Sequence, residues 1–200
     1  MLWGVQWYYW VILLATIILL IFVWRKALVS SKARRERLKK EAEIWKRDYD
    51  LRQNFTVLTK ERLDSTEDNQ LIHGVAMNIQ VELENATDML KAFEDLPFEK
   101  KVVYSLEYFD EDAKISLSAF FKNNGKPLTP VIPLALDAVG AEKYLPFVNK
   151  LAPMYDADSE ISVDRTIIAK TDEEFSEIFN SDELCHLTGA YIRKNNSIFL

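Results

Sequence analysis

The chain has 200 residues, with 31 Asp and Glu against 25 Lys and Arg, two histidines and a single cysteine, Cys185. One cysteine excludes an intrachain disulfide and fits a reducing compartment. The charge is uneven, because residues 25 to 47 hold ten basic and three acidic side chains, whereas residues 48 to 200 hold 15 basic and 28 acidic ones. An acidic region of that kind repels nucleic acid, so direct nucleic-acid binding is not expected.

Residues 3 to 24 carry no charge, and their interior is aliphatic or aromatic. As a helix, the 21 residues from Trp3 to Val23 would extend about 31 Å, which matches the hydrocarbon core of a bilayer. The pattern predicts a transmembrane helix in residues 1–24 with the lipid bilayer as a partner. The predicted membrane contacts are the interfacial aromatic residues and first cations Trp3, Trp7, Trp10, Trp24, Arg25 and Lys26.

The cations that follow this segment predict its orientation. Under the positive-inside rule, a single-pass protein of the inner (plasma) membrane would have its N-terminus outside and its C-terminal domain in the cytoplasm. The alternative is a translocated domain tethered by an uncut signal. The basic run itself is typical of a stop-transfer signal beside anionic headgroups, rather than of a nucleic-acid site.

Residues 25–64 are predicted to form a basic juxtamembrane stalk, helical at least to Asn54 because Gly and Pro are absent there. Leu38, Ala42, Trp45 and Tyr49 form a narrow apolar stripe at helical spacing. The stripe is compatible with a homodimer, and equally with packing against the following domain.

Residues 65–200 are predicted to form one acidic domain, and the fold class of the whole chain is all-α. Ser65 and Asp68 resemble a capping box, and a break at Asp95 and Pro97 precedes a second amphipathic helix from Phe98. The first helix is predicted from an apolar stripe with steps of three and four: Ile72, Val75, Ile79, Leu83, Ala86, Leu90 and Phe93.

The second half of the domain shows shorter patterns. Residues 112 to 122 fit either a strand or a helix, and the following Asn-Asn-Gly favours a helix. Thr129 is a candidate N-cap, and Gly140 is expected to end the helix that follows. A further helix is expected before Pro153, then an irregular acidic connector over residues 155 to 170. Thr171 with Glu174 predicts another capping box, and Ser181 the start of a last helix.

No convergent catalytic set is found. His186 adjoins Cys185, but consecutive helical residues point about 100° apart, which argues against a Cys-His pair. His73 lies beside the apolar stripe, and no His or Cys pair has metal-ligand spacing. We therefore expect no enzyme activity, no metal and no cofactor.

Two acidic clusters are candidate partner-binding sites. The first is Glu107, Asp110, Glu111 and Asp112, and the second is Asp156, Asp158, Glu160 and Asp164. The second is the favoured site because helix capping is not expected to account for it, whereas Asp172, Glu173 and Glu174 could serve as first-turn carboxylates. The alternative for either cluster is a solvated face that keeps the domain soluble.

Three stretches share their order with a known family: residues 118–123 (Ser-Ala-Phe-Phe-Lys-Asn), residues 135–144 (Ala-Leu-Asp-Ala-Val-Gly-Ala-Glu-Lys-Tyr) and residues 190–195 (Ala-Tyr-Ile-Arg-Lys-Asn). In this order the chain resembles the DNA-mimic-protein domain family, over roughly half its length. The resemblance implies an all-helical acidic domain, and in the family's namesake a surface that imitates DNA and occupies a DNA-binding protein. Residues 114–117 (Lys-Ile-Ser-Leu) stand where that family usually has Asn-Gly-Gly-Phe, so the role of that turn does not carry over.

The leading functional hypothesis is therefore a membrane-anchored acidic module that binds a basic protein, including the case of a DNA mimic that engages a DNA-binding protein. The main alternative is a structural or regulatory protein that dimerises through the stalk and acts on a membrane complex or neutralises a toxin. A hydrolase with buried carboxylates is a remaining third class.

Overall fold

The structure, a computed structural model, describes residues 12–14, 16–17, 34–40, 42–43, 46, 49–50, 55, 57–156 and 164–200. The chain divides into two compact units, Met1–Asp50 and Leu51–Leu200. Within the described ranges all regular structure is helical and no strand occurs, which confirms the all-α class.

The predicted transmembrane helix is corrected by this structure. A bilayer crossing takes about 20 consecutive, mostly apolar helical residues. No helix among the described residues combines that length with that apolar character, which overturns the predicted span, its single-pass topology and the inner-membrane localisation. Of the uncharged run, residues 12–14 and 16–17 are described, and they are helical and exposed. The predicted contacts Trp3, Trp7, Trp10, Trp24, Arg25 and Lys26 lie outside the described residues.

The rest of the first unit is described at residues 34–40, 42–43, 46 and 49–50, all helical and exposed. The assignment of residues 25–64 to a stalk stays a prediction. Leu38 and Tyr49 of the apolar stripe are among them, and each is more than half exposed. Ala42 is also described, whereas Trp45 is not.

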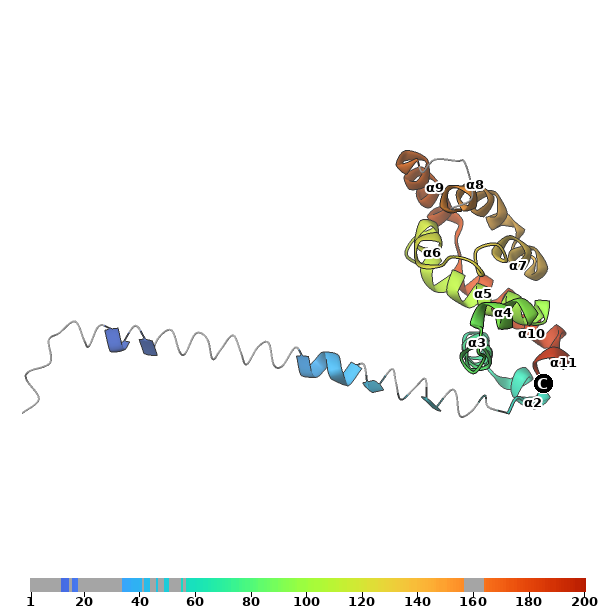
Figure 1. Ribbon diagram of the computed structural model, residues 1–200, viewed down its shortest axis with the longest axis horizontal. Helices are drawn as coiled ribbons and strands as arrows, with labels where there is room; N and C mark the ends of the chain where they lie inside the picture. The colour runs from blue at the N-terminus through green and yellow to red at the C-terminus, as the bar shows by residue number, and fades with distance from the viewer. Residues whose placement is uncertain are drawn as a thin grey trace, which may run out of the picture. The chain divides into compact units, whose positions relative to one another are not determined.

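The second unit is an assembly of short helices (Figure 1). Their bounds are α2 Lys60–Ser65, α3 Asp68–Glu84, α4 Met89–Asp95, α5 Phe98–Ala113, α6 Leu117–Asn123, α7 Ile132–Val139, the 3-10 turn η1 Glu142–Tyr144, α8 Leu145–Tyr155, α9 Arg165–Ile178, α10 Ser181–Lys194 and α11 Asn196–Phe199. Leu63 of α2 is fully buried, so part of the predicted stalk belongs to this unit.

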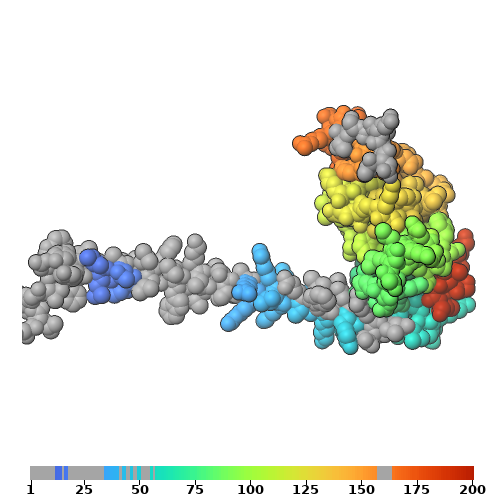
Figure 2. Space-filling view, viewed as in Figure 1, coloured from blue at the N-terminus to red at the C-terminus, as the bar shows by residue number. Residues whose placement is uncertain are grey.

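Helix α5 is shared by two hydrophobic clusters. Its residues Leu106 and Phe109 belong to a cluster with α6, α7, α8 and α9, and Val103 to a cluster with α2, α3 and α4. Helix α10 also joins both clusters, through Leu184 and Ile192. The C-terminal residues, red in Figure 2, accordingly pack beside the first helices of the unit, shown in teal and green. This arrangement holds α3, α5 and α10 together at the site described below.

The long apolar stripe is confirmed over α3 and only in part beyond it, where Phe93 of α4 is buried as predicted but Leu90 is not. Ile72, Val75, Ile79 and Leu83 are buried, but α3 ends at Glu84 and Leu90 is exposed. Asp88 explains the break, because its side chain accepts a hydrogen bond from the backbone N–H of Lys91 and caps α4.

Two capping boxes were predicted wrongly. Ser65 is the last residue of α2, so it cannot cap the helix that begins at Asp68. Thr171 lies inside α9, where it is buried and donates to the carbonyl of Ile167 at 2.7 Å. The true N-cap of α9 is Asp164, so the predicted connector is helical from Arg165 onward, and residues 157–163 lie outside the described residues.

Of the other predicted helix boundaries, some are confirmed and some are wrong. Residues 117–123 form a helix as expected, and Gly140 ends α7 at φ 80°, the left-handed conformation that glycine adopts at low cost. Thr129 caps no helix, since α7 starts at Ile132, and α8 continues through Pro153. Helix α10 begins at Ser181 as predicted.

Candidate functional site

A groove between α3 and α5 holds an imidazole beside two carboxylates. The Nδ1 atom of His73 lies 2.6 Å from Oε1 of Glu107. Glu111 follows Glu107 by one helical turn, so the two side chains share a face of α5. A ring nitrogen of His73 and one oxygen from each carboxylate all lie within 4.8 Å of one another. Partial desolvation at the edge of the groove raises the pKa of Glu111, and the charge of Glu107 raises it further.

The other end of the groove is lined by hydroxyl and amide groups. Tyr104 and Tyr108 each donate a hydrogen bond to Oε1 of Gln80, the second at 3.3 Å. Burial raises the pKa of Tyr104 well above its ordinary value, so its hydroxyl stays protonated. The groove has a volume of about 280 Å³, and Glu84 also lines it.

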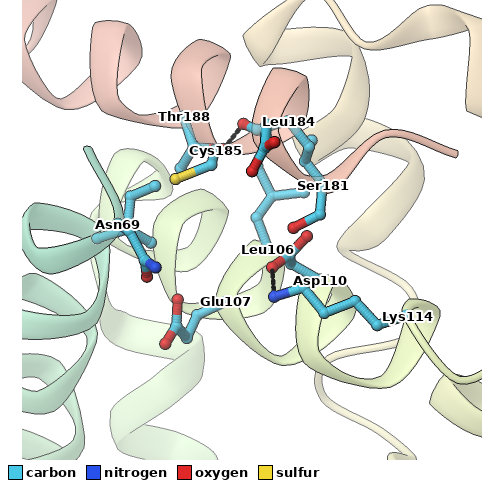
Figure 3. A pocket seen from close by; sticks show the side chains of 11 residues that line it. Asn69, Leu106, Glu107, Asp110, Lys114, Ser181, Leu184, Cys185 and Thr188 are labelled. Carbon is cyan, nitrogen blue, oxygen red and sulfur yellow. Dashed lines mark hydrogen bonds and ion pairs between the residues drawn. The ribbon is translucent and has the colours of Figure 1, made fainter. Parts of the chain in front are cut away.

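A second hollow of about 300 Å³ opens between α3, α5 and α10 (Figure 3). Asn69 of α3, Glu107 and Asp110 of α5, and Cys185 of α10 line it together with Ser181, Asp182 and Thr188. Glu107 lines both hollows, which therefore adjoin along α5.

The two hollows are strongly acidic. Their walls carry five carboxylates, those of Glu84, Glu107, Asp110, Glu111 and Asp182, whereas Lys114 is the only lysine or arginine among the described lining residues. Lys114 lies 2.5 Å from Oδ2 of Asp110 (Figure 3). The other oxygen of Asp110 is buried and has no hydrogen-bond partner in the described part of the chain. A buried acceptor without a donor is costly, so an external donor would be favoured there.

The thiol of Cys185 is not activated. Burial raises its pKa to about 11, and the charge of Asp110 acts in the same direction. Its neighbour His186 points to Asp68, with Nδ1 3.0 Å from Oδ2. The imidazole of His73 and Glu107 could move a proton, but catalysis also needs a reactive group in reach. The hydroxyls of Tyr104 and Tyr108 both donate to Gln80, so binding suits the geometry better than reaction.

The first predicted acidic cluster is partly brought together. Glu107, Asp110 and Glu111 line the two hollows. Asp112 is turned away from them, since its two oxygens accept hydrogen bonds from the side-chain amides of Asn123 at 2.7 Å and Asn124 at 2.6 Å. Asp112 therefore holds the end of α6 and is not part of the candidate site.

The second predicted cluster cannot be assembled from the described residues. Asp156 follows α8 and lies 3.6 Å from Nζ of Lys126. Asp164 caps α9, accepting from the N–H of Thr166 at 2.8 Å, so the expectation that capping does not account for this cluster is wrong there. Asp158 and Glu160 lie outside the described residues.

Asp172 also departs from its expected role. It lies inside α9 rather than in a first turn, and it accepts from the N–H of Ser118 at 2.8 Å and from its hydroxyl at 2.6 Å. This pair of bonds ties α9 to the start of α6.

The sequence interpretation missed the cluster of His73 with Glu107 and Glu111. His73 is 34 residues from Glu107, and no spacing within one helix connects the histidine to the two carboxylates. The available signal was the Glu-x-x-x-Glu pair, which marks one face of α5. Which helix would face that pair was not visible in the sequence.

Comparison with protein-family models, with curated proteins and with solved structures finds no match to this chain. The resemblance to the DNA-mimic-protein family therefore stays a prediction. Its three stretches fall on α6, on α7 with η1, and on α10.

Proposed function

We propose that the helical unit is a binding module for a basic protein, and that the partner places cationic side chains in the two hollows along α5. The observation that carries this proposal is the composition of the residues that line the two hollows. Glu107 lines both, and the described lining residues include five carboxylates and one lysine. Such a concentration of negative charge steers a cationic partner and selects against anionic ones.

The size of the hollows supports a side chain as the occupant. Volumes of about 300 Å³ and 280 Å³ lie at or below the lower end of small-molecule pockets. An arginine side chain is long and thin, and its guanidinium offers five N–H donors. One of these would satisfy the buried oxygen of Asp110, and others would reach Glu107 and Asp182.

The partner class that we propose is a protein whose basic surface ordinarily binds DNA. Two features support this class: the resemblance described above, and the excess of acidic over basic side chains in residues 48 to 200, 28 against 15. The same excess would keep duplex DNA itself from binding.

The proposal is tested by fluorescence anisotropy with the full chain and a labelled octa-arginine peptide as the probe. The test variant carries Asp110→Asn and Asp182→Asn, which remove two charges from one hollow and keep side-chain size. We expect binding to weaken roughly tenfold, because each partly exposed ion pair contributes up to about 1 kcal/mol.

The matched control carries Glu61→Gln and Glu142→Gln, two exposed carboxylates that line neither hollow. Net charge is then the same in both variants. The proposal holds if the control binds like wild type, and it is overturned if both variants weaken equally or if neither does.

A further inference from the structure

The cluster on α3 and α5 contains the ligand types that first-row transition ions take. His73 supplies an imidazole nitrogen, and Glu107 and Glu111 supply carboxylate oxygens. Mixed imidazole and carboxylate sets suit zinc and its neighbours, whereas calcium and magnesium prefer oxygen ligands alone. The donor set therefore indicates the class of ion.

The separations are close to those of a coordination shell. With metal–ligand bonds of about 2.0 to 2.2 Å, ligand atoms stand about 3 to 4 Å apart. The three donor atoms lie within 4.8 Å of one another. His73 Nδ1 and Glu107 Oε1 are 2.6 Å apart, a hydrogen-bond distance, so these two atoms would separate by roughly 1 Å to bind one ion. Glu111 is exposed at the edge of the groove, so a small rotation of its side chain would bring its oxygen into range.

The backbone holds the cluster on rigid elements. His73 follows the buried Ile72 in the middle of α3, and Glu107 follows the buried Leu106 in α5. Both helices are fixed by the hydrophobic clusters behind them, so the donors are positioned before an ion arrives. The adjoining groove of about 280 Å³ leaves room for water molecules on the remaining coordination positions.

The alternative is an ordinary His–Glu ion pair with a second carboxylate nearby. That arrangement leaves two acidic groups one helical turn apart in a partly buried groove, where like charges repel. An ion would remove this repulsion and use both carboxylates at once. In this alternative, His73 keeps its hydrogen bond to Glu107. When an ion binds, both residues exchange that hydrogen bond for bonds to the metal.

We propose that His73, Glu107 and Glu111 bind a divalent first-row transition ion, with Zn²⁺ as the probe, and with water completing the coordination. The site goes beyond the proposed partner binding. It lies in the groove between α3 and α5, so the two proposals share the carboxylates of Glu107 and Glu111, and the hollow lined by Asp110 and Asp182 distinguishes them.

Isothermal titration of ZnCl₂ into the full chain should show one site. The variant His73→Gln should weaken zinc binding by roughly tenfold or more, because it removes a direct ligand. Glu111→Gln should do the same. The matched control is His186→Gln, which removes the chain's other histidine, and a second control is Glu84→Gln, a groove carboxylate outside the cluster.

Loss of fold is checked by far-UV circular dichroism and thermal unfolding of each variant without metal. Visible absorption of the Co²⁺ form gives a second readout, because its bands depend on the ligand set, and these bands should change in His73→Gln. The proposal is overturned if wild type binds no zinc, if His186→Gln rather than His73→Gln loses the ion, or if His73→Gln binds as wild type does.

Failure of this site and failure of the proposed function are distinguishable. His73→Gln keeps every carboxylate, so it should lose zinc and keep octa-arginine binding in EDTA. Asp110→Asn with Asp182→Asn should weaken octa-arginine binding and keep zinc.

Discussion

Arg193 and Asp68 form an ion pair across 125 residues of sequence, with Nη1 of the arginine 2.5 Å from Oδ1 of the aspartate. The same guanidinium donates to the carbonyls of Leu63 at 3.0 Å and Thr66 at 2.7 Å. Arg193 thus ties the end of α10 to the turn between α2 and α3. Gly189 permits the close approach, because a Cβ there would stand 2.4 Å from Oδ1 of Asp68.

Replacement of Asp68 by Asn should lower stability in a pH-dependent way. Burial alone would raise the pKa of Asp68, but hydrogen bonds from Arg193 and His186 leave it below its ordinary value of 3.8. A lowered carboxyl pKa stabilises the folded state above pH 3.8, and this contribution is lost as the pH falls through the folded-state pKa. We expect Asp68→Asn to cost about 1 to 2 kcal/mol at neutral pH.

The check is urea unfolding of wild type and Asp68→Asn at neutral pH and again near pH 3. The difference between the two proteins should shrink at the acidic pH. A constant difference would mean that the carboxylate charge contributes nothing and that only shape is lost.

The core of α3 is tested by a pair of leucines from the same predicted stripe. Leu83 is 2% exposed and Leu90 is 58% exposed. Leu83→Ala should cost about 2 to 5 kcal/mol, because it leaves a cavity, whereas Leu90→Ala should change the free energy of unfolding by less than about 0.5 kcal/mol. Denaturant midpoints measure both, and equal effects would contradict the break between α3 and α4.

The contrast between these leucines shows which buried positions can be predicted from apolar periodicity. Periodicity predicted that both would face a core, and it was right for Leu83 because α3 continues regularly to Glu84. It was wrong for Leu90, since the cap at Asp88 starts a new helix with a different face. The hydrogen bond from Lys91 to Asp88 starts a new helix there, although the spacing of apolar residues runs on without a break.

Capping residues were also the weak point elsewhere. Thr171 and Asp164 are both acceptable N-caps by residue type, and the sequence interpretation chose the wrong one. Asp68 was predicted to complete a capping box, but its partners are Arg193 and His186 on α10. Contacts between distant helices leave no local pattern, which is also why the cluster at His73 was missed.

The thiol of Cys185 should be alkylated slowly although its side chain is partly exposed. A pKa raised from 9.0 to about 11 reduces the thiolate fraction at pH 8 roughly a hundredfold. Alkylation by iodoacetamide should therefore be about a hundredfold slower in the folded chain than in the chain unfolded by urea. The rate should still be rising near pH 10. Equal rates in the two states would contradict the burial of this thiol beside Asp110.

We propose that charge in the hollows along α5 drives binding to a basic partner, and the salt dependence of that binding is the decisive measurement. The Kd of the full chain for labelled octa-arginine is measured by anisotropy from about 50 to about 300 mM NaCl, where the screening length falls below the spacing of distant charges. We predict that wild-type affinity falls at least roughly tenfold over this range and that Asp110→Asn with Asp182→Asn shows a shallower slope. An affinity that barely changes with salt, or a slope unaltered in the double variant, would contradict the claim.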